Sequence, residues 1–225
     1  MKILIINPNS DLEMTAAIQR TAEDFASGDF EVVCLSISGA PQFIETYEDE
    51  IKAAPGMIDL VRENQDQYDA FVIACHDDPH LDALKEIAEK PVVGIGEASM
   101  KMATLLGHRF SVIQTTDHSI PIKESLVWKY HLQDLLASIR TPGRDSQDLA
   151  DAEKYFQAAR AAVEEDRAEV IVLGCAGMTG LDKRMQKELG VPVLDGVVCG
   201  LILASGLAKY GVSTSKARKY HPPSS

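Results

Sequence analysis

The stretches DAFVIACHDDPHLDALKEIAEKPVVG (Asp69 to Gly94) and EVIVLGCAGMTGLDKRMQKELGVPVLDG (Glu169 to Gly196) decide the fold. In each, an acidic residue and an apolar run lead into a cysteine, and Leu-Asp follows six and seven residues after that cysteine. A proline then precedes a second apolar run. The two cysteines, Cys75 and Cys175, therefore occupy the same register of a repeated strand–loop–helix–strand unit. We infer that two similar halves each offer one thiol at a strand end.

Short apolar runs alternate with longer amphipathic segments along the whole chain, which is typical of an α/β fold with parallel sheets. We expect strands at 2–6, 31–37, 70–74, 92–94, 110–113, 170–173 and 193–194. We expect helices at about 12–27, 50–65, 81–89, 98–106, 120–136, 150–165, 182–189 and 196–210.

The repeat extends beyond the cysteines, because KILIINPNS near the start and RFSVIQTTDHS from Arg109 both read as a strand that ends in polar residues. We expect two α/β lobes, with the ligand between them. Residues 1–97 plus 196–225 would form a discontinuous first lobe, and 98–195 the second. Residues 139–147 read as a surface loop, and the tail KARKYHPPSS is expected to fray.

The composition restricts the partners. The 225 residues carry a formal net charge of −12, which argues against a nucleic-acid surface and an anionic membrane. The apolar runs are too short for a signal peptide or a membrane span, so we expect a cytoplasmic protein. The four cysteines form no C-x-x-C pair. Cys34 and Cys199 lie in regular apolar stretches and are interpreted as small buried hydrophobic residues.

Ligands of parallel α/β sheets bind at the carboxyl ends of the strands, and four loops of this chain bring polar residues there. None of the four contains Lys or Arg, so a neutral substrate is favoured. Asn7, Thr115, Thr116 and backbone N–H groups could hold amide-like groups, and Gly177 would allow a close backbone approach. The loops are 7–10, 75–78, 114–117 and 175–179.

Each thiol precedes a predicted helix, whose free N–H groups would favour the thiolate. Thr179 with Asp182 fits a capping box, and Asp78 could cap the helix after Cys75. Asp77 and Asp78 adjoin Cys75 and would raise its pKa. We therefore expect Cys175 to be the resting thiolate.

The histidines of the first loop allow two alternatives. His76 next to Cys75 could be the base of a nucleophilic pair, although its side chain should point away from that of Cys75. The other interpretation, which we prefer, is that His76 lines the pocket and His80 is solvated at a helix start. No matching ligand cluster indicates a metal. GIGEAS from Gly94 lacks the third glycine of a dinucleotide loop, and no cofactor is expected.

INPNS, FIETYEDE, VIACHDDPHLDALKE, PVVGIGEASM, RFSVIQTTDHSIPI and VLGCAGMTGL followed by GVPVLDG resemble the Asp/Glu/hydantoin racemase superfamily, and within it the hydantoin/allantoin racemase branch. The resemblance covers residues 3 to about 210. It implies two pseudo-symmetric flavodoxin-like lobes, a homo-oligomer and cofactor-independent racemisation. It also implies that Cys75 and Cys175 are the two acid/base groups. The pocket contacts it suggests are Asn7, Ile44, His76, Thr115, Thr116, Ala176 and Gly177.

The expected substrate is a 5-substituted hydantoin or allantoin. Two departures from the family pattern, His76 after the first cysteine and the 114–118 loop, affect which substituent is preferred. The alternatives are an aspartate or glutamate racemase, which would need a cation for the second carboxylate, and a maleate isomerase-like enzyme. A single-thiol decarboxylase fits less well because both cysteines are present. A small-molecule-binding α/β module without turnover is the alternative outside enzymes.

Overall fold

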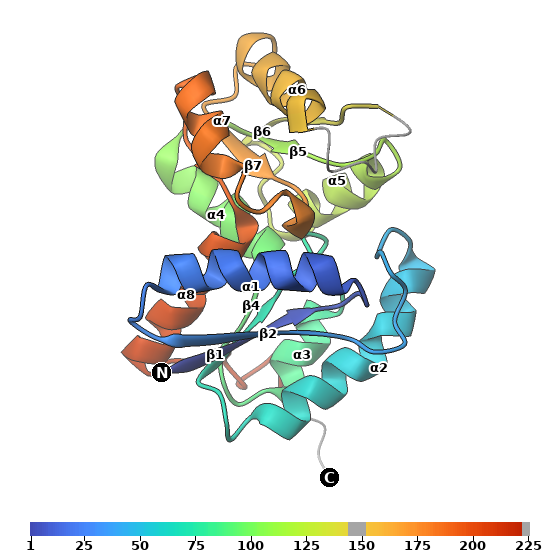
Figure 1. Ribbon diagram of the computed structural model, residues 1–225, viewed down its shortest axis with the longest axis vertical. Helices are drawn as coiled ribbons and strands as arrows, with labels where there is room; N and C mark the ends of the chain where they lie inside the picture. The colour runs from blue at the N-terminus through green and yellow to red at the C-terminus, as the bar shows by residue number, and fades with distance from the viewer. Residues whose placement is uncertain (144–151, 222–225) are drawn as a thin grey trace.

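The computed structural model describes residues 1–143 and 152–221, which form two lobes (Figure 1). Each lobe holds a four-stranded parallel sheet, and the strand orders are β2-β1-β3-β4 and β6-β5-β7-β8. The second sheet repeats the order of the first with every strand number raised by four, so the predicted α/β fold with two pseudo-symmetric lobes is confirmed. The strands are β1 (Lys2–Asn7), β2 (Glu31–Ser36), β3 (Ala70–Ile73), β4 (Val92–Gly94), β5 (Phe110–Ile113), β6 (Leu136–Arg140), β7 (Val170–Leu173) and β8 (Val193–Leu194).

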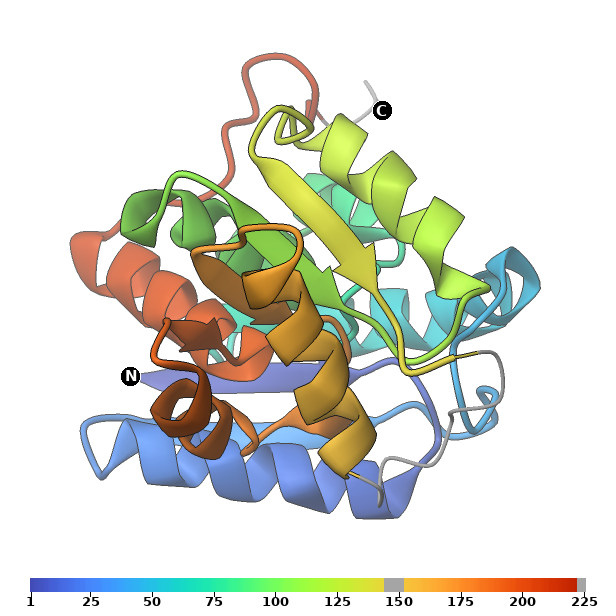
Figure 2. The same cartoon turned by 90° about the horizontal axis from the view of Figure 1, so that it is seen from above.

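The helices follow the same repeat, with four in each half (Figures 1 and 2). Two of them, α7 and α8, have the predicted bounds, and most others differ by one to three residues at an end. The predicted helix at 150–165 begins partly outside the described residues. The helices are α1 (Leu12–Ala26), α2 (Tyr47–Asn64), α3 (Leu81–Ile87), α4 (Ile95–Leu106), α5 (Ser119–Lys129), α6 (Ala152–Glu164), α7 (Asp182–Leu189) and α8 (Gly196–Tyr210), with a short 3₁₀ helix η1 (Ala176–Met178).

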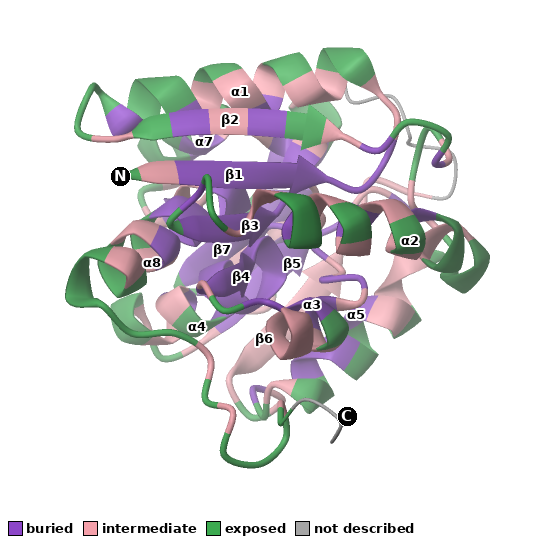
Figure 3. Ribbon diagram, turned by 90° about the horizontal axis from the view of Figure 1, so that it is seen from below, coloured by how far each residue is buried: buried purple, intermediate pink, exposed green. Residues whose placement is uncertain are grey.

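The central strands of each sheet are buried between layers of helices (Figure 3). Side chains alternate between the two faces of a strand, so both faces contribute to the core. On β1, Ile3 and Ile5 pack with α1 and α8, whereas Leu4 and Ile6 pack with α2 and α3. The second sheet is covered in the same way by α4 and α5 on one face and by α6 and α7 on the other.

Helices α4 and α8 join the lobes. They pack against each other, and α8 also packs on β3 and β4 of the first sheet although it follows the last strand of the second. α4 follows β4 of the first sheet and packs on β7 and β5. The last helix of each half therefore packs on the sheet of the other half. This supports a division into 1–97 plus 196–225 and 98–195, which remains a proposal.

Three predictions of local structure were wrong. The helix expected at 120–136 already ends at Lys129, as α5. Its expected last residue and the start of the loop expected at 139–147 belong instead to the edge strand β6. The rest of the predicted loop, from residue 144, lies outside the described residues. The tail, expected to fray from Lys216, is held against the first lobe as far as His221. Lys216 donates to the carbonyl oxygens of Lys85 and Glu86, and Lys219 forms an ion pair with Asp82. Among the described residues no helix is long and apolar enough to cross a membrane.

Candidate active site

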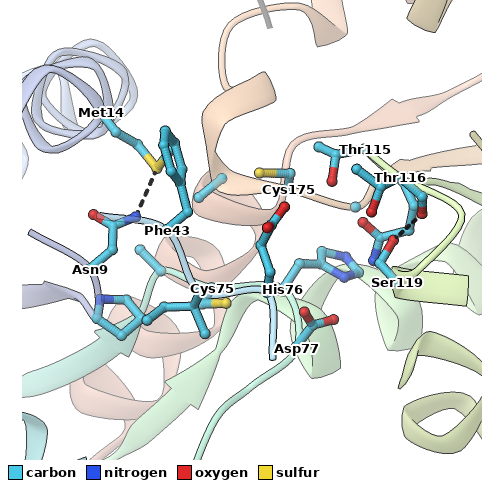
Figure 4. Close-up of a pocket in the computed structure, with 17 residues that line it drawn as sticks. Asn9, Met14, Phe43, Cys75, His76, Asp77, Thr115, Thr116, Ser119 and Cys175 are labelled. Carbon is cyan, nitrogen blue, oxygen red and sulfur yellow. Dashed lines mark hydrogen bonds between the residues drawn. The ribbon is translucent and has the colours of Figure 1, made fainter. Parts of the chain in front are cut away.

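A pocket lies where the carboxyl ends of β1, β3, β5 and β7 approach one another from the two lobes (Figure 4). Its wall combines two thiols, several amides and hydroxyls, two carboxylates and an apolar side from the first lobe. The lining residues are Pro8, Asn9, Met14, Phe43, Ile44, Glu45, Ala74, Cys75, His76, Asp77, Gln114, Thr115, Thr116, Ser119, Gly174, Cys175 and Ala176.

The two cysteines occupy equivalent positions. Cys75 lies two residues after the end of β3, and Cys175 lies two residues after the end of β7. β3 and β7 hold the same place in their sheets. The thiols enter the pocket from opposite lobes, so they lie on opposite sides of a ligand placed between them (Figure 4).

Both thiols are harder to ionise than an ordinary cysteine. Burial raises the pKa of the Cys175 thiol, and this is partly opposed by the N–H of Gly177, which lies 3.4 Å from Sγ. Burial raises the pKa of Cys75 well above its ordinary value, and the charge of Asp77 raises it further. Asp77 raises the pKa of both thiols, but the pKa of Cys75 is raised further above its ordinary value than that of Cys175, so Cys175 as the resting thiolate stays the prediction.

The longer helices that follow the thiols start too far away to act on them. α3 and α7 begin at Leu81 and Asp182, more than one turn beyond each thiol, and the dipole acts within the first turn. Cys175 is instead the N-cap of the short 3₁₀ helix η1, and its sulfur accepts from the N–H of Gly177 in that helix.

Both predicted capping arrangements were wrong as well. The hydroxyl of Thr179 donates to Asp195 at 2.6 Å instead of capping α7. Asp78 caps α4 instead of α3: its carboxylate accepts the N–H groups of Gly96 and Glu97 at 3.0 and 2.6 Å. This cap fixes the start of α4 to the loop that carries Cys75.

His76 is held in the pocket wall by contacts that leave neither ring nitrogen for Cys75. Ser99 Oγ donates to the carbonyl oxygen of Ile95 at 2.7 Å, so it accepts from Nε2 of His76 at 2.9 Å. Nδ1 then accepts from Lys123 Nζ at 2.7 Å. Burial and the charge of Lys123 lower the pKa of His76 well below its ordinary value. A neutral imidazole engaged at both nitrogens does not act as the base of a Cys–His pair.

Lys123 of α5 is a cation beside the site that the loop composition did not reveal. It is fully buried, and its Nζ also lies 2.7 Å from Oδ1 of Asp77, in ion-pair rather than aligned hydrogen-bond geometry. It does not line the pocket. The described part of the pocket wall contains Glu45 and Asp77 but no Lys or Arg.

The amides of the pocket differ in how they are held. Asn9 Oδ1 accepts from Asn7 Nδ2 at 2.7 Å and from the N–H of Asp11 at 2.9 Å, which fixes the Asn9 side chain in the wall. Gln114 is 2% exposed, and its Nε2 has no hydrogen-bond partner among the described residues. A buried amide donor without a partner in a pocket wall is suited to a polar ligand atom.

Most of the predicted site residues meet in this pocket. Two do not line it: Asn7 lies behind Asn9, and Gly177 directs its N–H at the Cys175 sulfur. The structure brings the other seven together in the pocket wall, and their roles stay predictions: Cys75, Cys175, Ile44, His76, Thr115, Thr116 and Ala176. Sequence reasoning missed the contribution of Met14, Phe43 and Ser119, for which the repeat gives no signal. No group of three or more His, Cys, Asp or Glu side chains in the described ranges forms a metal-binding cluster.

Comparison with known proteins identifies the family. A model of the Asp/Glu/hydantoin racemase family matches residues 3–204. The chain belongs to this family. Within the racemase family it is 42% identical to the hydantoin racemase of Pseudomonas sp. (strain NS671), over 99% of this chain and 92% of that protein.

Two solved structures of the racemase family superpose on the whole chain. Allantoin racemase from Klebsiella pneumoniae has a TM-score of 0.94 and 34% identity, and covers 100% of this chain and 94% of its own. Allantoin racemase from Pseudomonas fluorescens has a TM-score of 0.93 and 34% identity, with coverage of 100% and 98%.

Proposed function

We propose that this protein racemises 5-substituted hydantoins, the class that includes allantoin, with Cys75 and Cys175 as the two acid/base groups. The observation that carries the proposal is that equivalent cysteines from the two lobes line one pocket from opposite sides. The full-length likeness to a hydantoin racemase and to two allantoin racemases supports the substrate class.

The geometry suggests a simple proton balance. One cysteine, as thiolate, takes the proton from C5 of the ring, and the electron pair moves onto the adjacent carbonyl oxygen as an enolate. The other cysteine, as thiol, returns its proton to the opposite face of C5. The thiol and thiolate roles of the two cysteines are then exchanged. A cysteine thiol has an ordinary pKa of about 8.5, and burial raises the pKa of both thiols here, so near neutral pH the thiolate is a minor species but a strong base.

The polar wall would bind the ring and its developing charge. The buried amide of Gln114 and the hydroxyls of Thr115 and Thr116 can donate to carbonyl oxygens, and such donors stabilise an enolate as an oxyanion hole does. The described lining includes two carboxylates and no Lys or Arg, which favours a neutral ring over a dicarboxylic amino acid. Homo-oligomeric assembly and a cytoplasmic location stay predictions from the sequence.

Incubation of one enantiomer in D₂O tests the proposal. The wild-type enzyme should lose the optical rotation of the substrate and place deuterium at C5 at matching rates. A panel of alkyl and aryl hydantoins, allantoin, aspartate and glutamate distinguishes the substrate classes. Binding without exchange into any of these compounds would instead indicate a module that binds small molecules without turnover.

A further inference from the structure

The buried Lys123 needs an explanation that helix packing does not give. Taking an ammonium group out of water is strongly unfavourable unless it is paired and hydrogen-bonded. The Lys123 side chain is 0% exposed, and its polar contacts with the described residues are to the loop after β3: His76 Nδ1, the His76 carbonyl oxygen and Asp77. A helix of the second lobe thus places its charge on the loop of the first lobe that carries Cys75.

His76, which contacts Lys123, is neutral and carries none of the positive charge at this position. Ser99 fixes His76 as the neutral tautomer that carries its proton on Nε2, so His76 accepts from Lys123 and supplies no charge of its own. The negative group in contact with Lys123 is Asp77. Asp77 lines the pocket and raises the pKa of both thiols.

We propose that Lys123 is the positioning residue of the Cys75 loop, where its buried ammonium group fixes residues 75–77 and balances the charge of Asp77 so that Cys75 can alternate between thiol and thiolate. The proposal rests on the racemase function proposed above. Lys123 lowers the pKa of Cys75 and of Cys175, in opposition to Asp77.

Other charged groups face the same region from neighbouring elements. The charge of Glu45 raises the pKa of Cys175, and the charge of Cys175 raises the pKa of Cys75. Asp78 is buried beside Glu97 and Tyr130. Burial and the charge of Asp77 raise the pKa of Glu50 of α2 to about 7, and the charges of Lys123 and Lys129 oppose this increase. Since Glu45, Glu50, Asp78 and Glu97 remain in every variant below, a comparison of variants isolates the pair of Asp77 and Lys123.

The test compares K123M, D77N and the double variant D77N/K123M, with K129M as a matched control on the exposed side of the same helix. The measurement is the pH dependence of alkylation of Cys75 by iodoacetamide, followed by peptide mass spectrometry, beside kcat/KM for racemisation. For K123M we expect the midpoint of Cys75 alkylation to rise by about one pH unit or more and kcat/KM at pH 8 to fall by about tenfold or more, because one pKa unit is a factor of ten. D77N should lower the midpoint, and the double variant should return both quantities to within about threefold of wild type.

Each outcome decides the role. If K123M and the double variant lose activity equally while the alkylation midpoint stays at the wild-type value, Lys123 is a packing residue and the proposal is wrong. If K123M does not fold, D77N alone decides, because an unshifted midpoint in D77N contradicts the charge balance. Alkylation needs no turnover. Shifted midpoints in a protein that racemises none of the tested compounds would therefore reject the proposed function and retain the charge balance.

Discussion

Gly174 and Gln114 lie so close that a side chain on Gly174 would collide with the amide of Gln114. A Cβ at Gly174 would lie 2.9 Å from the Gln114 amide carbon and 2.6 Å from the carbonyl oxygen of Ile113. The glycine before Cys175 therefore lets β5 and β7 bring the Gln114 amide and the thiol into one pocket wall.

Gly174→Ala is expected to damage both the fold and the site. The backbone must shift to relieve the contact with Ile113, at a cost of about 1–3 kcal/mol in the free energy of unfolding. The shift displaces Cys175, and a misplacement of about 1 Å can reduce the rate roughly a hundredfold. Urea unfolding and racemisation kinetics measure the two effects. Wild-type values for both would show that the close approach does not constrain the site.

Gly206→Ala is the matched control. Gly206 lies in α8, is exposed, and has open space where its Cβ would be. Alanine there should raise the free energy of unfolding by about 0.5–1 kcal/mol, because it limits the unfolded chain. Racemisation should be unchanged.

Tyr130→Phe should destabilise the protein more at pH 8 than at pH 4.5. The Tyr130 hydroxyl donates to Oδ2 of Asp78 at 2.6 Å, and burial raises the pKa of Asp78 to about 6. The ordinary value is about 3.9, so between about pH 4 and 6 the folded state holds the proton more tightly than the unfolded state. The ionisation of Asp78 therefore costs stability as the pH rises through this range, and the hydrogen bond from Tyr130 offsets part of that cost.

The expected loss for Tyr130→Phe is about 1.5–3 kcal/mol at pH 8, where the acceptor is charged, and about 1 kcal/mol at pH 4.5, where it is protonated. Urea denaturation of both proteins at the two pH values gives the difference. Equal losses at both values would mean that Asp78 does not change its charge over this range.

Iodoacetamide should alkylate Cys175 before Cys75 at pH 8. Burial and the charge of Asp77 raise the pKa of both thiols, but that of Cys75 lies further above its ordinary value, so a smaller fraction of Cys75 is thiolate. Cys34 and Cys199 are internal controls, because burial raises the pKa of each to about 12. Peptide mass spectrometry over time orders the four thiols. Faster modification of Cys75 than of Cys175 would contradict the proposal that Cys175 is the resting thiolate.

The sheets and the two thiols could be predicted from the sequence because they depend on local patterns that occur twice. Apolar runs that end in Cys75 and Cys175 mark β3 and β7 and place both thiols at the same sheet edge. β6 was missed because LASIR is an edge strand with no fully buried residue, so it lacks the apolar signal of the others. The expected helix overran into it because nothing in the sequence marks the stop at Tyr130.

The features that tune the site depend on contacts between distant segments. Asp78 caps α4 instead of the adjacent α3, and Thr179 binds Asp195 instead of Asp182. Lys123 lies within α5 and reaches His76 across 47 positions in the sequence. The strand-end loops, which lack Lys and Arg, therefore give no sign of the cation beside the thiols.

Solvent exchange in the single variants Cys75→Ser and Cys175→Ser tests the two-thiol mechanism most directly. Each pure enantiomer of a substrate that the wild-type enzyme racemises is incubated in D₂O with each variant, and deuterium at C5 is measured above the uncatalysed rate. Each variant should lose racemisation but still exchange one enantiomer, on the face of its remaining thiol, and the two variants should exchange opposite enantiomers. Exchange of the same enantiomer by both variants, or racemisation at the wild-type rate by either, would contradict the account.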